Sequence, residues 1–356
     1  MNKAYNLFYE KMFSDTHPIT LGLFRVFVGM IMLIQFINLE EYITLGLPQS
    51  EYFIKYDFFG WVNLMSPENI SSLFFTLKIA SLFFILGVFY RIASILLFLG
   101  WTYIFLLDAG HYNNHYYLYV LILFLMMFVR ANKWGTISHI FNKKESVPVP
   151  LWNVWILQFQ MVVVYFYGGI AKINLDWLNG YPMRYWLASK TTNSFWNDLL
   201  TSEFAVYFFS YTGLIFDLAI GFLLLYKKTR KWALIPLLLF HIGNHFLWSI
   251  GTFPYFSLAA TIVFFPANDV AKWFKLKAIP PALNTNSIKN KITASLIVVY
   301  VLFQTLFPFR HLLYDGSPSW NGYGDAFSWR MMLTTKASAS KFKIKIPSQN
   351  IEGYVD

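Results

Sequence analysis

Residues 19–39 read ITLGLFRVFVGMIMLIQFINL and contain a single charged residue, Arg25. About 20 consecutive apolar residues are what an α-helix needs to cross the roughly 30 Å hydrocarbon core of a bilayer. Blocks of the same kind recur at 70–89, 92–107, 115–130, 152–171, 204–226, 232–250, 254–266 and 292–308. The sequence therefore predicts an all-α, polytopic integral membrane bundle of eight or nine transmembrane helices. The block 254–266 is short, and we expect it either to be re-entrant or to tilt in with its flanks.

The composition agrees with a membrane environment. Of 356 residues, 57% are hydrophobic and only 13% are charged, which does not fit a surface that faces water. The net charge of +10 does not indicate a nucleic-acid partner, because no basic run carries interleaved aromatic residues in a folded context. The expected partner is the lipid bilayer. The absence of cysteine from the sequence excludes disulfides, thiolate nucleophiles and thiolate metal sites.

The basic residues are concentrated in alternate loops. With nine spans and a cytoplasmic N-terminus, the outer loops before the tail hold only Lys55, Lys172, Arg184 and Lys190. The cytoplasmic segments hold Lys3, Lys11, Arg91, Arg130, Lys133, Lys143, Lys144, Lys227, Lys228, Arg230, Lys231, Lys272, Lys275, Lys277, Lys289 and Lys291. This positive-inside asymmetry predicts a cytoplasmic N-terminus and an outer C-terminus. No cleavable signal pattern precedes the first block, so we expect the N-terminus to be retained.

The sequence divides into a transmembrane helical domain, 1–310, and an outer C-terminal segment, 311–356. Within that segment Lys341–Ile346, KFKIKI, alternates polar and apolar residues, which is typical of a half-buried β-strand. A single strand is not stable alone. Either it pairs with another segment, or the chain stops shortly after entering an outer β domain.

Four polar clusters lie where ionisable side chains are costly, and each is therefore a candidate functional feature. The first is DAGHYNNHYYLY at 108–119, which includes Asn114 and His115. An interfacial belt of tyrosines explains it equally well.

The second cluster is YFYGGIAKINLDW at 165–177, where Gly168 and Gly169 let a neighbouring helix approach just before Lys172. Burial would favour the neutral lysine and make it a usable base, whereas snorkelling to the interface is the commoner alternative.

The third cluster, HIGNH at 241–245, places His241, Asn244 and His245 on one face of an apolar helix, and we expect all three to point inward. Two histidines at this spacing suit zinc, but a third ligand is not evident, so hydrogen-bonded core histidines and no metal are predicted.

The fourth cluster is WNGYGDAFSWRMML at 320–333, where two glycines indicate a turn. Its Trp, Phe and Met residues form an apolar lid, a binding wall or simple interfacial packing. In the nine-span topology all four clusters reach the outer side, which predicts one outward-facing cavity.

At these residues the sequence resembles the vitamin K-dependent γ-carboxylase family and the wider bacterial group that shares its HTTM-type transmembrane domain. Residues 113–119, NNHYYLY, are similar to the family's NNHSYLY, and 164–181 are similar to VYFIAGVKKLDADWVEGY. Residues 240–253 are similar to FHCMNSQLFSIGMF, and SWRMM at 328–332 is similar to YSWDMM. The order is preserved, and the resemblance covers about 19–335.

The resemblance implies an activity and its residues. Lys172 takes the place of the base that deprotonates vitamin K hydroquinone. The implied cofactor of this chain is vitamin K hydroquinone or menaquinol, with O2 and CO2 as co-substrates. The anion reacts with O2, the resulting strong base removes a γ-proton from a peptidyl glutamate, CO2 adds, and the quinone leaves as its epoxide. Asn114 and His115 match residues that stabilise charge near the reacting atoms. The implied cofactor-binding residues are His241, Asn244, Trp329, Met331 and Met332. The implied partner is a glutamate-containing peptide at the outer face, and the implied location is a bacterial inner membrane.

The sequence also departs from the family. The large outer β domain is expected to be absent or cut off after Asp356, Arg330 replaces an acid, and Ala171 replaces the lysine that precedes the base. The quinol half of the chemistry is thus better supported than carboxylation. The alternatives are a quinol epoxidase without carboxylation, or a non-catalytic membrane protein of peptide maturation or immunity. A transporter is disfavoured, because paired broken helices in two halves of the chain are not evident.

Overall fold

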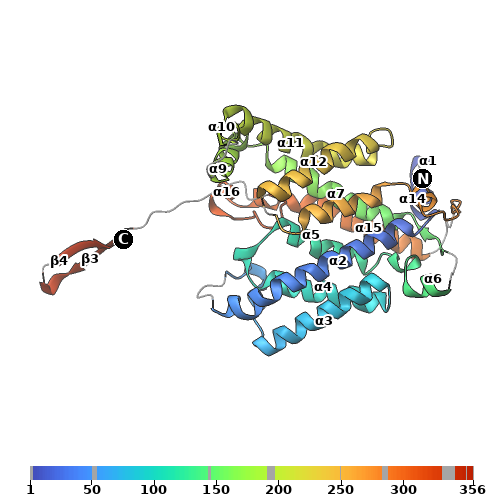
Figure 1. Cartoon of the computed structure of the whole chain (residues 1–356), viewed down its shortest axis with the longest axis horizontal. Coiled ribbons are helices and arrows are strands. Elements are labelled where there is room, and N and C mark those ends of the chain that lie inside the picture. Colours follow the sequence, from blue (N-terminus) through green and yellow to red (C-terminus); the bar gives the residue numbers. More distant parts are fainter. Residues whose placement is uncertain are drawn as a thin grey trace.

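The computed structural model describes residues 3–49, 54–142, 146–190, 197–248, 250–282, 288–330, 341–349 and 351–355. Most of this part of the chain is helical (Figure 1). The main helices are α2 (Ile19–Glu41), α3 (Pro67–Leu86), α4 (Tyr90–Leu106), α5 (Asn114–Met126), α7 (Trp152–Ala171), α11 (Glu203–Leu225), α12 (Arg230–Trp248), α13 (Phe253–Ala260) and α15 (Ile288–Leu306). Every apolar block predicted from the sequence has become one of these helices, which confirms the all-α bundle.

Shorter elements connect and flank them. The short helices are α1 (Lys3–Phe13), α6 (Ile137–Asn142), α8 (Leu175–Leu178), α9 (Tyr181–Ser189), α10 (Asn197–Leu200), α14 (Ala267–Trp273) and α16 (Pro318–Asn321). A π-helix, η1 (Tyr42–Gly46), continues α2, and the 3₁₀ turns are η2 (Leu47–Gln49), η3 (Asp57–Phe59), η4 (Ala109–His111), η5 (Ala131–Lys133), η6 (Thr261–Phe264), η7 (Phe307–Leu313) and η8 (Pro347–Gln349).

By length and composition, five helices among the described residues can cross a membrane: Ile19–Gln49, α3, α7, α11 and Ile288–Leu313. A sixth is added if α5 and the following stretch Ala131–His139, bent by 60°, count as one span. Helix α4, with 17 residues, and the stretch Phe253–Phe264 are apolar but shorter. The chain is therefore a multi-pass membrane protein, and the total of eight or nine spans stays a prediction.

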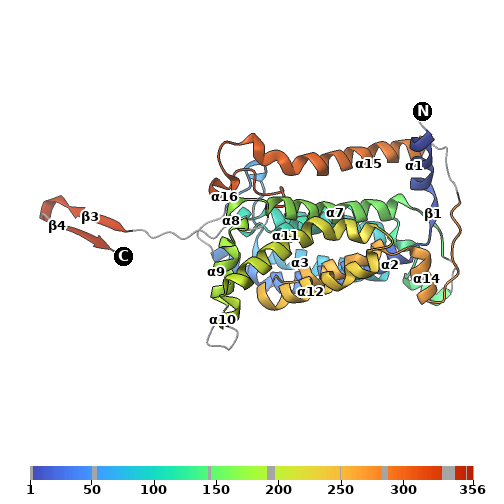
Figure 2. The same cartoon turned by 90° about the horizontal axis from the view of Figure 1, so that it is seen from above.

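The helices run alternately between two ends of the bundle. At one end the side chain of Arg25, near the start of α2, donates to Ile85 O at the end of α3 and to Ala131 O after α5, at 3.1 and 3.0 Å. Strand β1 (Asp15–Thr16) pairs there with β2 (Val149–Pro150), just before α7. Figures 1 and 2 show α1 and α14 at this end, and α9, α10 and α16 at the opposite end.

Glycines bring α7 and α11 into close contact. A Cβ on Gly169 would lie 2.8 Å from Leu218 N, and one on Gly221 would lie 3.2 Å from Val162 Cα, so each glycine faces the other helix without room for a side chain. Small residues at facing positions are what allows two membrane helices to approach this closely. The close approach expected before Lys172 is confirmed, and the neighbouring helix is α11.

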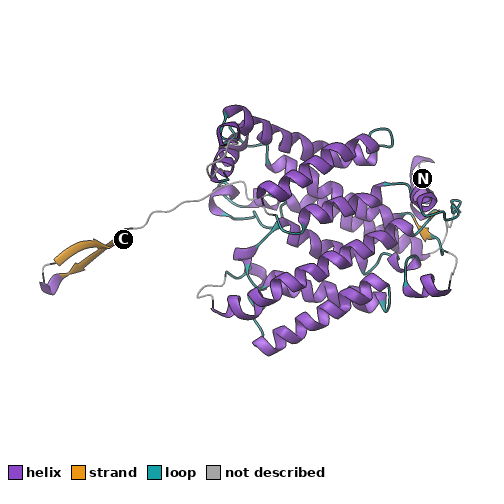
Figure 3. Cartoon of the chain, in the orientation of Figure 1, coloured by secondary structure: helices purple, strands orange, loops and turns teal. Residues whose placement is uncertain are grey.

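The C-terminal segment contains a β-hairpin. Strand β3 (Phe342–Ile346) pairs antiparallel with β4 (Ile351–Val355), with Phe342 opposite Val355 and Ile346 opposite Ile351. Figure 3 shows the two strands apart from the helices. The strand predicted from the alternating KFKIKI pattern is thus confirmed, and it pairs with the segment that follows it.

Candidate functional site

Lys172 is held inside the bundle at the end of α7. Its backbone caps the helix, and its side chain folds back so that Nζ donates to Gly168 O at 3.2 Å. Nζ also lies 2.5 Å from Asp217 Oδ2 and 5.3 Å from the centre of the Trp177 ring. Only 3% of the lysine side chain is exposed. Lys172 is therefore buried and paired, and does not snorkel to the interface.

Asp217 is the partner that the sequence reasoning missed. It lies in the middle of α11, is 7% exposed, and faces α7 at Gly168, where a Cβ would come 3.4 Å from Oδ2. Of the two alternatives left open by the sequence, burial and snorkelling, the structure has burial, and a carboxylate accompanies the lysine. The signal was present in the sequence: Asp217 is the one charged residue in the apolar block 204–226, which makes it a functional candidate by the same argument.

Two histidines continue from this pair along the bundle. His241 on α12 is buried, and its Nε2 lies 2.9 Å from the hydroxyl of Tyr165, two helical turns before Lys172 on α7. The ring of Phe253 lies 5.8 Å from His241 and 5.7 Å from His115 on α5. The two histidines predicted for the site therefore meet across one aromatic ring. Within the described residues, His241 Nδ1 has no hydrogen-bond partner.

Asn114 faces a different neighbour. Its amide nitrogen donates to Arg330 O at 2.6 Å, and its amide oxygen accepts from the Tyr112 hydroxyl at 2.8 Å. The ring of Trp329 packs on Tyr117 at 4.8 Å, and the Phe327 N–H donates to Tyr112 at 2.8 Å. The segment 327–330 thus rests directly on the start of α5.

The backbone of the segment 327–330 is strained. Phe327 and Trp329 have φ angles of +64° and +56°, in the left-handed region that costs a non-glycine residue roughly 1–2 kcal/mol. Trp329 is buried, and its indole Nε1 has no partner in the part of the chain that the structure describes. Met331 and Met332, the other predicted members of this wall, lie outside the described residues.

The expectation that all of His241, Asn244 and His245 point inward is wrong for His245. Asn244 is half-buried, but His245 is exposed beside Tyr255, with ring centres 5.3 Å apart. The buried side chains described on α12 are Ala233, Leu237 and His241, at a spacing of four residues. Such a stripe drifts around the helix by about 40° per step, so by position 245 it has left the contact face. Among the described residues, no group of three His, Asp or Glu side chains is placed to hold a metal ion.

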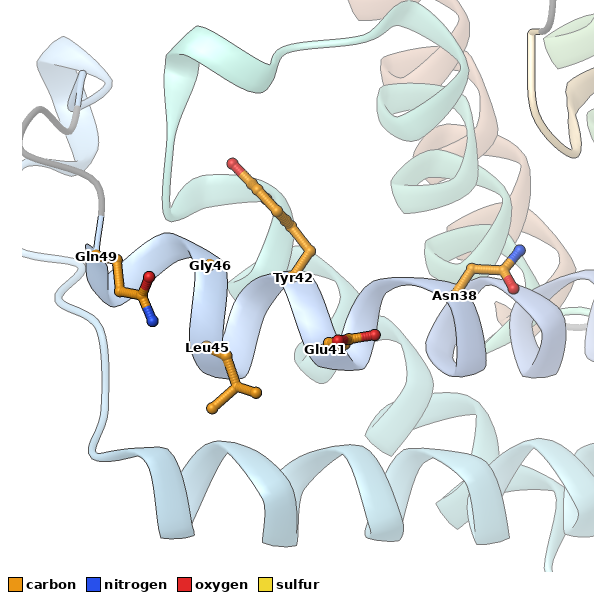
Figure 4. Close-up of a pocket in the computed structure, with 6 residues that line it drawn as sticks. All are labelled: Asn38, Glu41, Tyr42, Leu45, Gly46 and Gln49. Carbon is orange, nitrogen blue, oxygen red and sulfur yellow. The ribbon is translucent and has the colours of Figure 1, made fainter.

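Two hollows on the surface of the described residues bear on the predicted cavity. One, of about 380 Å³, lies at the C-terminal end of α2 and is lined by Asn38, Glu41, Tyr42, Leu45, Gly46 and Gln49 (Figure 4). There the Tyr42 hydroxyl lies 2.8 Å from His111 Nε2, and His111 Nδ1 lies 2.7 Å from Asp108 Oδ2. The other lies between α7, α11 and α15. In the described part of the chain neither is lined by Lys172, His115 or His241, so the common cavity stays a prediction.

Two family models match the chain. The model described as HTTM domain matches residues 13–269, which contain Lys172, Asp217 and both histidines. The model described as the lumenal domain of vitamin K-dependent gamma-carboxylase matches residues 289–356, which contain Trp329 and the β-hairpin. No solved structure matches the chain.

Proposed function

Because the chain belongs to the HTTM-domain family and also carries a segment matched by the γ-carboxylase lumenal domain, we propose that it is a quinol-dependent γ-glutamyl carboxylase. Its reaction couples the epoxidation of vitamin K hydroquinone, or of menaquinol, by O2 to the addition of CO2 to a peptidyl glutamate. The peptide is reached from the outer face, where α7 ends. The basic residues support this orientation. Helix α14, which carries Lys272, lies at the same end of the bundle as the N-terminal helix α1. Basic residues are typical of the cytoplasmic side, so the opposite end is the outer face.

The observation that carries the proposal is the buried pair of Lys172 and Asp217. A buried ion pair is generally no more stable than apolar side chains of the same volume, so stability alone gives little reason for it. The 2.5 Å separation of Nζ and Oδ2 lets a proton pass from the ammonium to the carboxylate. The resulting neutral amine can accept a proton from a bound hydroxyl group. Lys172 thus acts as the base and Asp217 as its proton acceptor.

The described residues fit a quinol. His241 Nδ1 and Trp329 Nε1 are buried polar atoms without partners in the described part of the chain, and each suits a quinol oxygen. When bound, the quinol supplies the electrons that reduce O2 and the strong base that attacks glutamate. The Asn114 amide, which donates to Arg330 O, holds the segment 327–330 against α5. His115 stabilises the charge that develops near the reacting atoms. Asn244, Met331 and Met332 complete the proposed binding residues, the two methionines from outside the described residues.

The test is an epoxidation assay. The detergent-purified protein is incubated with vitamin K hydroquinone under O2, with and without a glutamate peptide and CO2, and the epoxide is measured. We expect Lys172→Ala to abolish epoxide formation, and Lys172→Arg to fail as well, because arginine stays protonated. Lys190→Ala, at an exposed lysine after α9, is the matched control and should keep full activity. Full activity in Lys172→Arg would refute the role as a base.

A non-catalytic membrane protein is the second candidate. It is favoured by the fact that Lys172 and Asp217 satisfy each other and join α7 to α11 without a ligand. It predicts that folded wild-type protein forms no epoxide under any of these conditions. Epoxide formation that is independent of peptide and CO2 would instead indicate a quinol epoxidase without carboxylation.

A further inference from the structure

The hollow at the C-terminal end of α2 lies on a helix that is longer than a membrane requires. The helix Ile19–Gln49 has 31 residues, a length of about 46 Å at 1.5 Å per residue. The hydrocarbon core of a bilayer is about 30 Å thick, so about ten residues extend beyond it. The first charged residues after Arg25 are Glu40 and Glu41, which mark the start of this extension.

The extension lies at the same end of the bundle as Lys172. Strands β1 and β2, which directly precede α2 and α7, pair with each other at the opposite end. Both helices therefore begin at one end of the bundle and end at the other. In the proposed orientation the extension of α2 projects on the outer face, where the peptide arrives.

The hollow occupies one face of this extension. Figure 4 shows its lining residues along the side of α2 and of the turns that continue it. They recur at the spacing of a single helical face: Asn38, Glu41, Tyr42, Leu45, Gly46 and Gln49. All six are exposed, whereas Ile43 and Leu47 on the opposite face are buried. The hollow of about 380 Å³ thus presents a carboxylate, two amides and a phenol ring away from the core.

The phenol ring is fixed by a chain of hydrogen bonds. Asp108 Oδ1 accepts from Gly110 N at 2.8 Å and from Ile54 N at 3.2 Å, which holds this carboxylate in place. Asp108 Oδ2 lies 2.7 Å from His111 Nδ1. Because a carboxylate only accepts, His111 Nδ1 carries the proton, and Nε2 accepts from the Tyr42 hydroxyl at 2.8 Å. Tyr42 is therefore a positioned aromatic wall, and the face of a tyrosine ring attracts cations.

Glu41 supplies an uncompensated negative charge beside this ring. Its neighbour Glu40 pairs with Lys78 at 2.8 Å, whereas Glu41 has no ion pair among the described residues. The surrounding segment 38–69 contains five acidic residues and one lysine, in a chain whose net charge is +10. Such a local excess of negative charge attracts a cationic partner and disfavours an acidic one. The backbone adds a second sign of function, since the middle turn Tyr42–Gly46 is a π-helix, which is rare and frequent at functional sites.

We propose that this hollow binds a lysine or arginine side chain of the peptide substrate, between the Glu41 carboxylate and the Tyr42 ring. The inference rests on the proposed function, in which a glutamate-containing peptide is the substrate. From His111 the chain reaches Asn114, at the start of α5, in three residues, a distance of at most about 11 Å. An extended peptide therefore places its basic residue about three residues from the glutamate at the reacting centre.

The test measures peptide binding without catalysis. Fluorescein-labelled glutamate peptides carry either lysine or norleucine, its uncharged analogue, three residues from the glutamate. Their binding to the detergent-purified full chain is followed by fluorescence anisotropy without quinol or CO2. We expect the wild type to bind the lysine peptide about two- to fivefold more tightly, as an exposed ion pair allows. High salt should reduce the preference, because it screens exposed charges.

Two carboxylate-to-amide variants locate the preference. Glu41→Gln should bind the lysine and norleucine peptides equally. Glu68→Gln changes an exposed carboxylate in the first turn of α3, outside the hollow, and should keep the wild-type preference. In the carboxylation assay Glu41→Gln should raise KM for the lysine peptide two- to fivefold and leave kcat unchanged, because it removes binding and not transition-state stabilisation.

A charge swap separates binding from loss of structure. Glu41→Lys should prefer a peptide with aspartate at the tested position to one with lysine, which inverts the wild-type order. In the wild type, a series of peptides with lysine one to ten residues from the glutamate should bind most tightly at a separation near three.

The outcomes distinguish the hollow from the proposed function. If the lysine preference depends on Glu41 but no carboxylation is detected, the proposed function fails and the hollow assignment stands. If the peptides are carboxylated with equal KM, the proposed function stands and the assignment is overturned. Equal effects of Glu41→Gln and Glu68→Gln, or no peptide binding at all, would also overturn it. So would loss of bound phosphatidylethanolamine from Glu41→Gln with the peptide preference unchanged, since the hollow would then hold an ammonium head group.

Discussion

The buried pair between α7 and α11 gives the sharpest prediction. Asp217→Asn keeps the size of the side chain but removes the charge that faces Lys172 Nζ at 2.5 Å. The two side chains are only 3% and 7% exposed, so water cannot replace the lost partner. Breaking a buried pair by removing one member typically costs 3–5 kcal/mol, because the other charge is left uncompensated. We expect Asp217→Asn to lose about that much stability.

A matched control lies on the same helix. Glu203, at the start of α11, pairs with Arg184, and the two side chains are 64% and 36% exposed. Because water solvates both partners, the same carboxylate-to-amide change, Glu203→Gln, should alter stability little. Unfolding of the two variants and of the wild type in one detergent, followed by circular dichroism or by a thermal-shift dye, gives the comparison.

A third variant separates charge from packing. Replacing both residues, as Lys172→Met with Asp217→Leu, removes the charges together and should restore much of the stability lost in Asp217→Asn, because apolar pairs commonly replace buried ion pairs without loss. It should remain inactive in epoxide formation. If Asp217→Asn unfolds at the same temperature as Glu203→Gln, the pair is not buried and the reasoning about Lys172 is refuted.

Three further predictions concern the rest of the molecule. In this cysteine-free chain, Lys228→Cys should be labelled only from the cytoplasmic side and Asp57→Cys only from outside; the reverse pattern would invert the orientation. Gly169→Ala places a Cβ 2.8 Å from the α11 backbone and should cost about 1–3 kcal/mol, whereas Gly243→Ala meets nothing within 4 Å and should be tolerated or stabilising. Burial lowers the pKa of His17 below its usual value of 6.5 in the folded protein. As the pH falls, the unfolded chain therefore binds a proton at His17 before the folded protein does, and stability should decrease below about pH 6.5. In His17→Gln that fall should be smaller in melting curves recorded from pH 7.5 to 5.5.

The positions of the helices were predictable because lipid leaves the backbone no alternative partner for its hydrogen bonds. The predicted block 152–171 coincides with α7, Trp152–Ala171. The ends were less predictable where a tertiary contact extends a helix. The first block was expected to end at 39, but α2 continues through Glu40, which pairs with Lys78 on α3 at 2.8 Å, and then passes into the π-helix η1.

The hairpin illustrates a second kind of limit. The alternation of KFKIKI predicted β3, because a period of two is a local property of the strand itself. Its partner β4, IEGYV, has a glycine in the middle and a weaker alternation, so its pairing depends on β3 beside it. A strand whose main support is its neighbour carries little of the signal in its own sequence.

The candidate site shows what a single sequence withholds and what it already contains. The glycines before Lys172 indicated a close helix, but they did not decide between burial and snorkelling, because the deciding partner, Asp217, lies 45 residues away. Yet the block 204–226 contains one charged residue, and a lone carboxylate there is as costly as a lone lysine. The free-energy cost of placing two opposite charges in or beside apolar helices is lowest when the two side chains pair with each other. Their coexistence therefore predicts the contact between α7 and α11, and with it the burial of Lys172.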